Sequence, residues 1–424
     1  MLDENNLHAD DASIGSLLCK RQAGHTLPAQ LYISQAAYLA DCDAIFAKHW
    51  IAVGVDCDVE EPGDVIAIEI GTSSIVIVRD DDMNIRAFHN VCSHRGSRLV
   101  PPGRSVVGKL VCPYHQWTYD LDGALALAPQ MGVDFDRSLH HLKPVALRSI
   151  GGILYACLSD EPPDDITHLI NKVGPRLAPY DLTNAKVAFE TEIIEDGNWK
   201  LTMENNRECY HCASNHPELS LSFHSADFGF DPEGLTPTEK DEADALAKAY
   251  EEQGKIWEMQ GLDPTAIEHT VGYPTNFRMQ RLIIAGLGES QTMDTRAASA
   301  IPLGNMTMSG SGDLHLWGIN SWNHIMADHA VIFTAFPMGP DKTLVRTKWL
   351  VNKDAVEGED YDLDHLTAVW KATNAEDANL VALAHQGVSS AGYRPGPYSP
   401  FTERALDEFA TWYVERMTAH GYAT

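Results

Sequence analysis

Two short clusters of cysteine and histidine constrain this chain more than any other feature. Cys92 and His94 form the first cluster, and Cys112 and His115 form the second. Together they supply the ligand set of a Rieske-type [2Fe–2S] cluster, in which one iron keeps both cysteines and the other takes both histidines. The same side chains also suit tetrahedral zinc. Zinc fingers place their two cysteines together and their two histidines together, so the interleaved order favours the iron–sulfur cluster.

A second metal-binding signature lies in residues 198–217, which are too polar for a buried core helix. His211 and His216 would point about 140° apart on one continuous helix. Pro217 predicts that the helix ends before His216, so both imidazoles can turn toward one point. Two imidazoles and a carboxylate are the facial triad of non-haem Fe(II) centres. Glu208, three residues before His211, is a candidate ligand or orienting residue.

The carboxylate that completes this triad is expected from the C-terminal part of the chain. Asp360, Asp362, Asp364 and Asp377 all qualify by residue type. Residues 375–386 predict a helix that would lay an early aspartate against the interior of a sheet. The residue pattern alone leaves these alternatives open.

Composition narrows the classes of partner. The chain has 424 residues and a formal net charge of -29 at pH 7. This charge argues against nucleic acid or an anionic membrane surface as a partner, and is compatible with a cationic substrate or a basic redox partner. We find no apolar run long enough for a transmembrane helix, and residues 1–5 are acidic, unlike a secretory leader. We therefore expect a cytoplasmic protein with no membrane partner.

Hydrophobic patterning predicts three parts. Residues 1–44 form a helical N-terminal segment, residues 45–160 a small antiparallel β domain that carries the two cysteine–histidine loops, and residues 161–424 an α+β domain. Strands are expected at 64–70, 74–79, 85–88, 187–194, 314–317, 330–336 and 344–351. Cys209 and Cys212 form a C-x-x-C pair beside His211, for which a redox motif is the alternative to simple packing.

These motifs resemble the oxygenase (alpha) components of the Rieske non-haem iron oxygenases. Residues 92–96 and 112–117 look like the cluster loops of that family, and 198–216 looks like its mononuclear iron segment. The resemblance implies a helix-grip catalytic domain with a large antiparallel sheet, with the N-terminal helical segment packed on it. It also implies a third iron ligand on a late helix. Position by position, Asp377 matches that ligand, and Glu376 is the alternative.

The resemblance further implies a homotrimer in which an acidic residue links an iron histidine to a cluster histidine of the next subunit. Here Glu208 would face His115 of a neighbouring subunit. Most ring-hydroxylating members carry an aspartate in this role, with one more residue before the ligand histidine. Because the chain has no nucleotide-binding glycine motif, NADH would be oxidised by a separate flavin- or ferredoxin-type reductase, and O2 would be the co-substrate.

Within this family, residues 204–212, 321–324 and 393–400 resemble the branch that acts on quaternary ammonium compounds. The resemblance implies hydroxylation of an N-methyl group, which gives formaldehyde and the demethylated amine, with glycine betaine favoured over proline betaine or carnitine. A permanent cation is recognised by aromatic rings. The candidate rings are Tyr210, Trp317, Trp322, Phe333, Phe336 and Trp349, and the candidate partners for a substrate carboxylate are Arg278, Arg281 and Arg346.

Two other functions compete with this interpretation. A pure electron carrier would need only the first metal site, and would bind two irons per chain where an oxygenase binds three. An aromatic ring-hydroxylating dioxygenase would release a cis-diol without formaldehyde. A carrier would leave the second domain, with His211, His216 and Asp377, without a purpose. The departure at Glu208 and the resemblance to the quaternary-ammonium branch favour the N-demethylating oxygenase over the aromatic dioxygenase.

Overall fold

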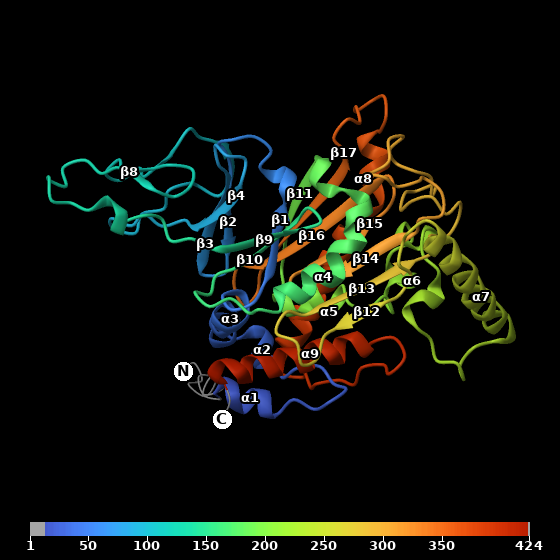
Figure 1. Cartoon of the computed structure of the whole chain (residues 1–424). Helices are drawn as coiled ribbons and strands as arrows, with labels where there is room; N and C mark the ends of the chain where they lie inside the picture. The colour runs from blue at the N-terminus through green and yellow to red at the C-terminus, as the bar shows by residue number, and fades with distance from the viewer. Residues whose placement is uncertain (1–12, 423–424) are drawn as a thin grey trace.

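The computed structural model describes residues 13–422, in which a small β region lies beside a larger region of helices and sheet (Figure 1). The small region contains the two cysteine–histidine loops, and the larger one contains residues 198–217. All the strand pairs are antiparallel. The predicted α+β class, with a small antiparallel β domain and a large antiparallel sheet, is confirmed.

The small region is built from three short sheets, ordered β4-β3-β2-β5, β6-β7-β8 and β1-β10-β9. The first hairpin pairs two apolar runs, with Val65 opposite Val78 and Ile68 opposite Ile75. Both of its faces are buried, since the valines and the isoleucines belong to two different apolar clusters. The strands are β1 (Ile51–Val55), β2 (Asp64–Ile70), β3 (Ser73–Arg79), β4 (Ile85–His89), β5 (Gly103–Val106), β6 (Leu110–Val111), β7 (Thr118–Tyr119), β8 (Leu125–Leu127), β9 (Ala146–Ile150) and β10 (Ile153–Cys157).

The large sheet has seven strands in the order β11-β17-β16-β15-β14-β13-β12. The sequence pattern predicts four of them. It misses β12, β13 and β15, which carry arginine, glutamine, histidine and asparagine where an apolar alternation is expected. The strands are β11 (Ala185–Glu195), β12 (Ile267–His269), β13 (Phe277–Leu282), β14 (Asp313–Trp317), β15 (Ser321–Ile325), β16 (His329–Pro337) and β17 (Thr343–Asn352).

Helix α8 (Leu363–Val388) packs against this sheet (Figure 1). Its buried side chains include Trp370, Thr373, Asp377 and Val381, at the three- and four-residue spacing of one helix face. The prediction that this helix begins at residue 375 is wrong. It begins at Leu363, because the side chain of Asp362 caps it by accepting a hydrogen bond from the backbone N–H of His365 at 3.0 Å.

The N-terminal helices and the last helix of the described chain lie together beside the larger region (Figure 1). Tyr32 donates a hydrogen bond to Glu204 at 2.8 Å, and the indole of Trp199 donates to Asp41, also at 2.8 Å. The helices are α1 (Ile14–Cys19), α2 (Ala29–Ile33), α3 (Gln35–Asp41), α4 (Ile166–Leu177), α5 (Trp199–Asn205), α6 (Cys212–Asn215), α7 (Pro237–Met259) and α9 (Arg404–Met417).

The predicted domain boundaries at 44/45 and 160/161 stay a prediction. A π-helical turn (Cys42–Phe46) continues α3 across the first of them, and the second falls between β10 and α4. The predicted helical segment 1–44 and the acidic residues 1–5 lie partly or wholly outside the described residues.

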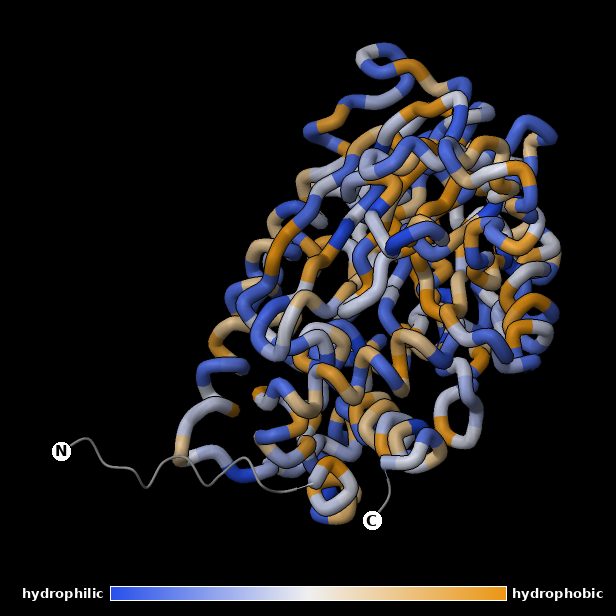
Figure 2. Tube along the Cα trace, turned by 90° about the vertical axis from the view of Figure 1, so that its left-hand side faces the viewer, coloured by the Kyte–Doolittle hydropathy of each residue, from blue (hydrophilic) through white to orange (hydrophobic). Residues whose placement is uncertain are grey.

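Within residues 13–422 we find no helix that combines the length and the apolar character needed to cross a membrane. Figure 2 shows hydrophilic residues interspersed with hydrophobic ones along the chain.

Candidate active site

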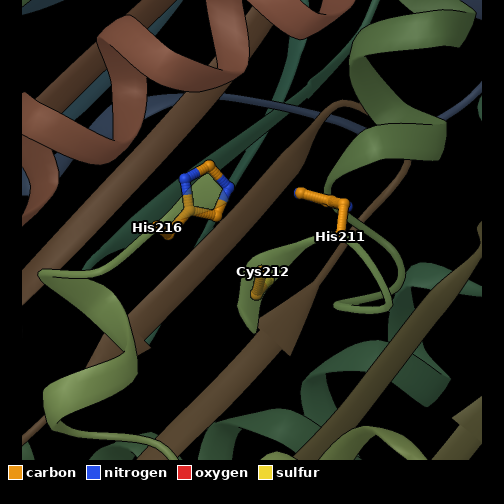
Figure 3. Close-up of side chains that lie close together, drawn as sticks. All are labelled: His211, Cys212 and His216. Atoms are coloured by element: carbon orange, nitrogen blue, oxygen red, sulfur yellow. The ribbon is translucent and has the colours of Figure 1, made fainter. Parts of the chain in front are cut away.

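His211 and His216 lie at the two ends of the short helix α6. His211 is its N-cap and His216 its C-cap, so the helix ends before His216 as the sequence predicts. Their ring centroids are 5.1 Å apart, and Figure 3 shows the side chains directed into one region of space. A break in the helix is therefore what brings two imidazoles five residues apart to one point.

Asp377 of α8 completes this group. Its Oδ1 lies 3.0 Å from Nε2 of His216 and 3.5 Å from Nε2 of His211. Nε2 of His216 is buried and has no aligned hydrogen-bond partner among the described residues. Two imidazole nitrogens and a carboxylate oxygen therefore converge as a facial triad requires, and this donor set fits non-haem Fe(II). The role of these three residues as iron ligands stays a prediction.

Each imidazole contacts a second carboxylate at its other ring nitrogen, Nδ1. Glu208 Oε1 lies 2.6 Å from Nδ1 of His211, and Glu376 Oε2 lies 2.8 Å from Nδ1 of His216. A carboxylate on Nδ1 fixes the ring orientation and leaves Nε2 for a metal. Glu376, the alternative ligand, thus lies on the side of His216 that faces away from Asp377.

Electrostatics agree with this arrangement. Burial by itself would lower the pKa of His211, but hydrogen bonds with Asp377 and Glu208 raise it to about 9. Burial would raise the pKa of Asp377, but the two imidazoles and Asn205 lower it to about 2. The three carboxylates therefore concentrate negative charge where a divalent cation would bind.

Two supporting residues escaped the sequence analysis. Asn205, the last residue of α5, donates a hydrogen bond to Oδ1 of Asp377 at 2.6 Å. Asn206 accepts one at its backbone carbonyl from the indole of Trp317 at 2.8 Å. Both stand in the resemblance segment 204–212, but their partners are more than 100 residues away in the chain, so no local pattern could identify them.

Cys209 and Cys212 are joined by a disulfide, with their Cα atoms 4.9 Å apart. The prediction that they pack as free cysteines is wrong, because the turn before α6 brings their backbones within disulfide range. The sulfur of Cys212 lies within 4.8 Å of ligand nitrogens of both histidines, but it is bonded to Cys209 and is no free thiolate. Cys42, Cys57, Cys92, Cys112 and Cys157 form no disulfide among the described residues.

The two cysteine–histidine loops share one backbone design. The N–H of Cys92 donates to Ser97 and the N–H of Gly96 donates back to Cys92, and Cys112, Gln116 and Trp117 repeat this pattern. The fifth residue of each loop has a positive φ, +75° at Gly96 and +61° at Gln116. Glycine adopts this conformation freely and Gln116 does so at a cost, which local function commonly explains.

The side chains of these loops fit a two-iron cluster better than a single zinc ion. His94 and His115 have ring centroids 4.7 Å apart, and the hydroxyl of Tyr119 lies 3.3 Å from Sγ of Cys92. Around one zinc ion the four ligand atoms would lie within about 4 Å of one another. Among the described residues two groups bring three ligand atoms within 4.8 Å, and neither contains these side chains.

A cavity of about 250 Å³ adjoins the triad. Of the predicted rings, Trp317 and Trp322 line it, whereas Phe333 stacks on Trp322 and Phe336 and Trp349 are buried in the core. Tyr210 is 67% exposed and does not line it. The rings that sequence analysis missed are Phe223, Phe228, Trp370 and Phe401.

One of the three predicted arginines reaches this cavity. Arg278 lines it, with its guanidinium 4.8 Å from the centroid of Trp317. Arg281 donates a hydrogen bond to the hydroxyl of Tyr180, and Arg346 pairs with Glu192. Neither of these two lines the cavity.

Family models match both parts of the chain. The Rieske [2Fe-2S] domain matches residues 49–143, and the catalytic domain of the ring hydroxylating alpha subunit matches residues 182–419. The chain belongs to the Rieske oxygenases. The alpha-subunit model spans more than half of the chain, and together the two matches include all eight predicted site residues. The predicted family is confirmed.

Curated relatives of this Rieske oxygenase cover nearly its whole length. The glycine betaine monooxygenase oxygenase subunit of Chromohalobacter salexigens is 42% identical over 418 residues, which are 98% of this chain and 91% of the relative. A Pseudomonas aeruginosa subunit of the same name is 40% identical and covers 95% and 91%. The predicted resemblance to the quaternary-ammonium branch is confirmed, and the chain is an oxygenase subunit of the monooxygenase type.

Solved structures support the fold. A quaternary ammonium Rieske monooxygenase, bound to an inhibitor, is 22% identical with a TM-score of 0.69 and covers 95% of this chain and 98% of its own. Naphthalene 1,2-dioxygenase from Rhodococcus is 18% identical with a TM-score of 0.66, and covers 93% and 95%. The architecture is thus shared across substrate classes, so the fold alone does not select a substrate.

Proposed function

We propose that this oxygenase hydroxylates an N-methyl group of a quaternary ammonium compound, with glycine betaine as the favoured substrate. The observation that carries the proposal is the cavity beside the triad, which combines tryptophan and phenylalanine rings with the partly buried cation Arg278. Aromatic faces attract a quaternary ammonium group that cannot be hydrogen-bonded at nitrogen. A guanidinium pairs with a carboxylate. The cavity thus offers both halves of what a zwitterionic betaine requires.

We propose that two sets of residues hold two redox centres. Cys92, Cys112, His94 and His115 would hold the [2Fe–2S] cluster, and His211, His216 and Asp377 would hold Fe(II). When bound, the cluster supplies single electrons and the Fe(II) site supplies activation of O2. Glu208 and Glu376 keep the imidazoles oriented. Glu208 would also link His211 to His115 of the next subunit in a homotrimer.

The proposed reaction balances with two electrons from outside the chain. One oxygen atom of O2 enters a C–H bond of the methyl group, and the other leaves as water with two electrons and two protons. The resulting hemiaminal breaks its C–N bond and releases formaldehyde, the demethylated amine and a proton. We propose that a separate flavin- or ferredoxin-type reductase delivers the electrons from NADH in the cytoplasm.

The experiment is formaldehyde release from glycine betaine, proline betaine and carnitine in parallel, with a flavin reductase, NADH and O2. Formaldehyde from one of them, at one equivalent per substrate consumed, is the expected result. A fully loaded enzyme should contain three irons per chain, and two would point to an electron carrier instead. An iron-loaded enzyme that forms a cis-diol from an arene, and no formaldehyde from any betaine, would overturn the proposal.

A further inference from the structure

The sheet wall of the cavity carries a polar cluster that the proposed oxidation does not use. Arg278 and Gln280 of β13 are the cross-strand partners of Trp317 and His315 of β14. Cross-strand partners point to the same face of a sheet, and residues two apart on a strand do too. All four side chains line the cavity. Pairing between β13 and β14 therefore sets three hydrogen-bonding side chains around one indole.

His315 is the least satisfied member of this cluster. Its residue is 5% exposed, and neither ring nitrogen has a hydrogen-bond partner among the described residues. Burial, then the nearby His324 and Arg278, lower its pKa well below the usual range, so the ring is neutral. A neutral imidazole carries one N–H donor and one acceptor. A buried donor without a partner is costly, so a ligand that accepts this hydrogen bond is favoured here.

A metal ion is a poorer occupant than a small anion. Ligand atoms of Asp313, His315 and His324 do lie within 4.8 Å of one another. The rings of His315 and His324, however, are 3.9 Å apart at an interplanar angle of 38°, and imidazole lone pairs lie in the ring plane. Overlapping rings do not aim both lone pairs at one ion. Oδ2 of Asp313 also already accepts hydrogen bonds from His324 at 2.7 Å and from Gln291 at 3.0 Å.

Arg278 supplies the charge. Its side chain donates to Oε1 of Gln280 at 3.0 Å and lies 3.4 Å from Glu268. Glu268 is shared with Arg404, which it contacts at 2.8 Å, so its charge is divided between two arginines. Trp317 lies next to both polar groups. Its ring centroid is 3.3 Å from that of His315 and 4.8 Å from the guanidinium carbon of Arg278.

We propose that Arg278, Gln280 and His315 form the subsite for the carboxylate end of the substrate. This inference rests on the proposed function and adds which residues distinguish a betaine from a plain quaternary cation. The indole of Trp317 bonds the backbone of Asn206, which ties the subsite to the segment that carries Glu208 and His211. A short zwitterion held here by its carboxylate presents its ammonium group to the aromatic rings of the same cavity.

The test measures binding to iron-loaded enzyme by calorimetry, with glycine betaine and with choline. Choline keeps the trimethylammonium group but has no carboxylate. His315→Phe keeps the stacking on Trp317 and removes both hydrogen-bonding atoms. We expect it to raise Kd for glycine betaine about ten- to hundredfold, since a hydrogen bond to a charged group is lost, and to change Kd for choline less than about twofold. Arg278→Gln should show the same selectivity, and His315→Gln should recover part of the affinity.

His269→Phe is the matched control. His269 is a buried histidine of the adjacent strand β12, stacked on Phe277 at 4.8 Å, and it does not line the cavity. The His269→Phe enzyme should bind glycine betaine and choline with the same Kd values as the unchanged enzyme. An unchanged Kd for glycine betaine in His315→Phe, or an equal loss for both ligands, would overturn the subsite. An unchanged enzyme that binds neither ligand would overturn the proposed function, and an enzyme that releases formaldehyde while His315→Phe binds normally would overturn the subsite alone.

Discussion

Each imidazole of the candidate iron site contacts two carboxylates, one at each ring nitrogen. Asp377 serves both rings at Nε2, while Glu208 and Glu376 each serve one ring at Nδ1. The two glutamates make the same kind of contact with an imidazole, but they belong to different structural elements. Glu208 belongs to the loop before α6, and Glu376 belongs to α8. This difference allows the orienting role to be separated from a role in electron transfer.

Glu208→Gln is expected to keep both metal sites and to slow turnover about ten- to a hundredfold. The amide still accepts a hydrogen bond from His211 but carries no charge toward a neighbouring cluster. The measurement is reoxidation of the reduced cluster in a single turnover with O2 and substrate, together with iron content. Glu376→Gln is the control, because it removes the same charge from His216 and reports the cost of lost orientation. Equal reoxidation rates in the two variants would contradict the bridging role.

A buried carboxyl at Glu195 predicts a pH-dependent stability. Burial raises its pKa to about 7, against the hydrogen bond donated by Thr202 at 2.6 Å. The contribution of protonated Glu195 to folding stability is therefore fully present below pH 4.5, which is the ordinary pKa of a glutamate. This contribution is lost as the pH rises through about 7. Glu195→Gln mimics the protonated form. The free energy of unfolding of the variant minus that of the unchanged protein should be larger at pH 8 than at pH 5, by at most about 3 kcal/mol. Urea unfolding at both values checks this, and an equal difference at both would refute it.

At the scale of elements, α8 determines which carboxylate faces the two histidines. Its buried face contains Trp370, Thr373 and Asp377, and the adjacent residue Glu376 is rotated about 100° away, toward the other side of His216. The same face places Trp370 in the wall of the cavity beside the triad. One helix therefore supplies the predicted iron ligand Asp377, the group on Nδ1 of His216 and a ring of the cavity wall.

The N-cap of α8 gives a test at this scale. Asp362→Ala removes the hydrogen bond accepted from His365, and should lower the free energy of unfolding by about 1 kcal/mol. Iron occupancy should be kept, because Asp377 lies about four turns further along the helix. Asp364→Ala, an exposed first-turn acid that makes no cap, should cost less. Equal losses in the two variants, measured by urea unfolding, would show that the cap is unimportant.

At the scale of the whole molecule, the proposal places the two redox centres that cooperate in different subunits. Cys92→Ser should lose the colour of the cluster, and His211→Ala should lose only the mononuclear iron, so each variant should be inactive by itself. Co-expression should restore formaldehyde release to a measurable fraction of the normal rate, because a mixed trimer contains intact cross-subunit pairs. Purified mixed oligomers that carry both chains and both metals but have no activity would contradict transfer between subunits.

The sequence by itself determined which residues are predicted to form the two metal sites. Cys92, His94, Cys112 and His115 lie in short loops, and the break before His216 is a local effect of Pro217. The hairpin strands β2 and β3 could equally be predicted, since short apolar runs separated by turn residues are a local pattern. Such features depend on residues that are close together in the chain, so they can be predicted from the sequence alone.

Only the tertiary structure decided what surrounds those predicted ligands. The strands β12, β13 and β15 were missed, because their polar residues are stabilised by pairing with other strands of the sheet. The start of α8 and the disulfide at Cys209 were missed although each depends on residues three apart in the chain. The carboxylate of Glu376 on Nδ1 of His216, the Asn205 hydrogen bond and the cluster around His315 depend on which helix face and which strand register meet in space. Register and helix face are set by packing of the whole core, which no local pattern records.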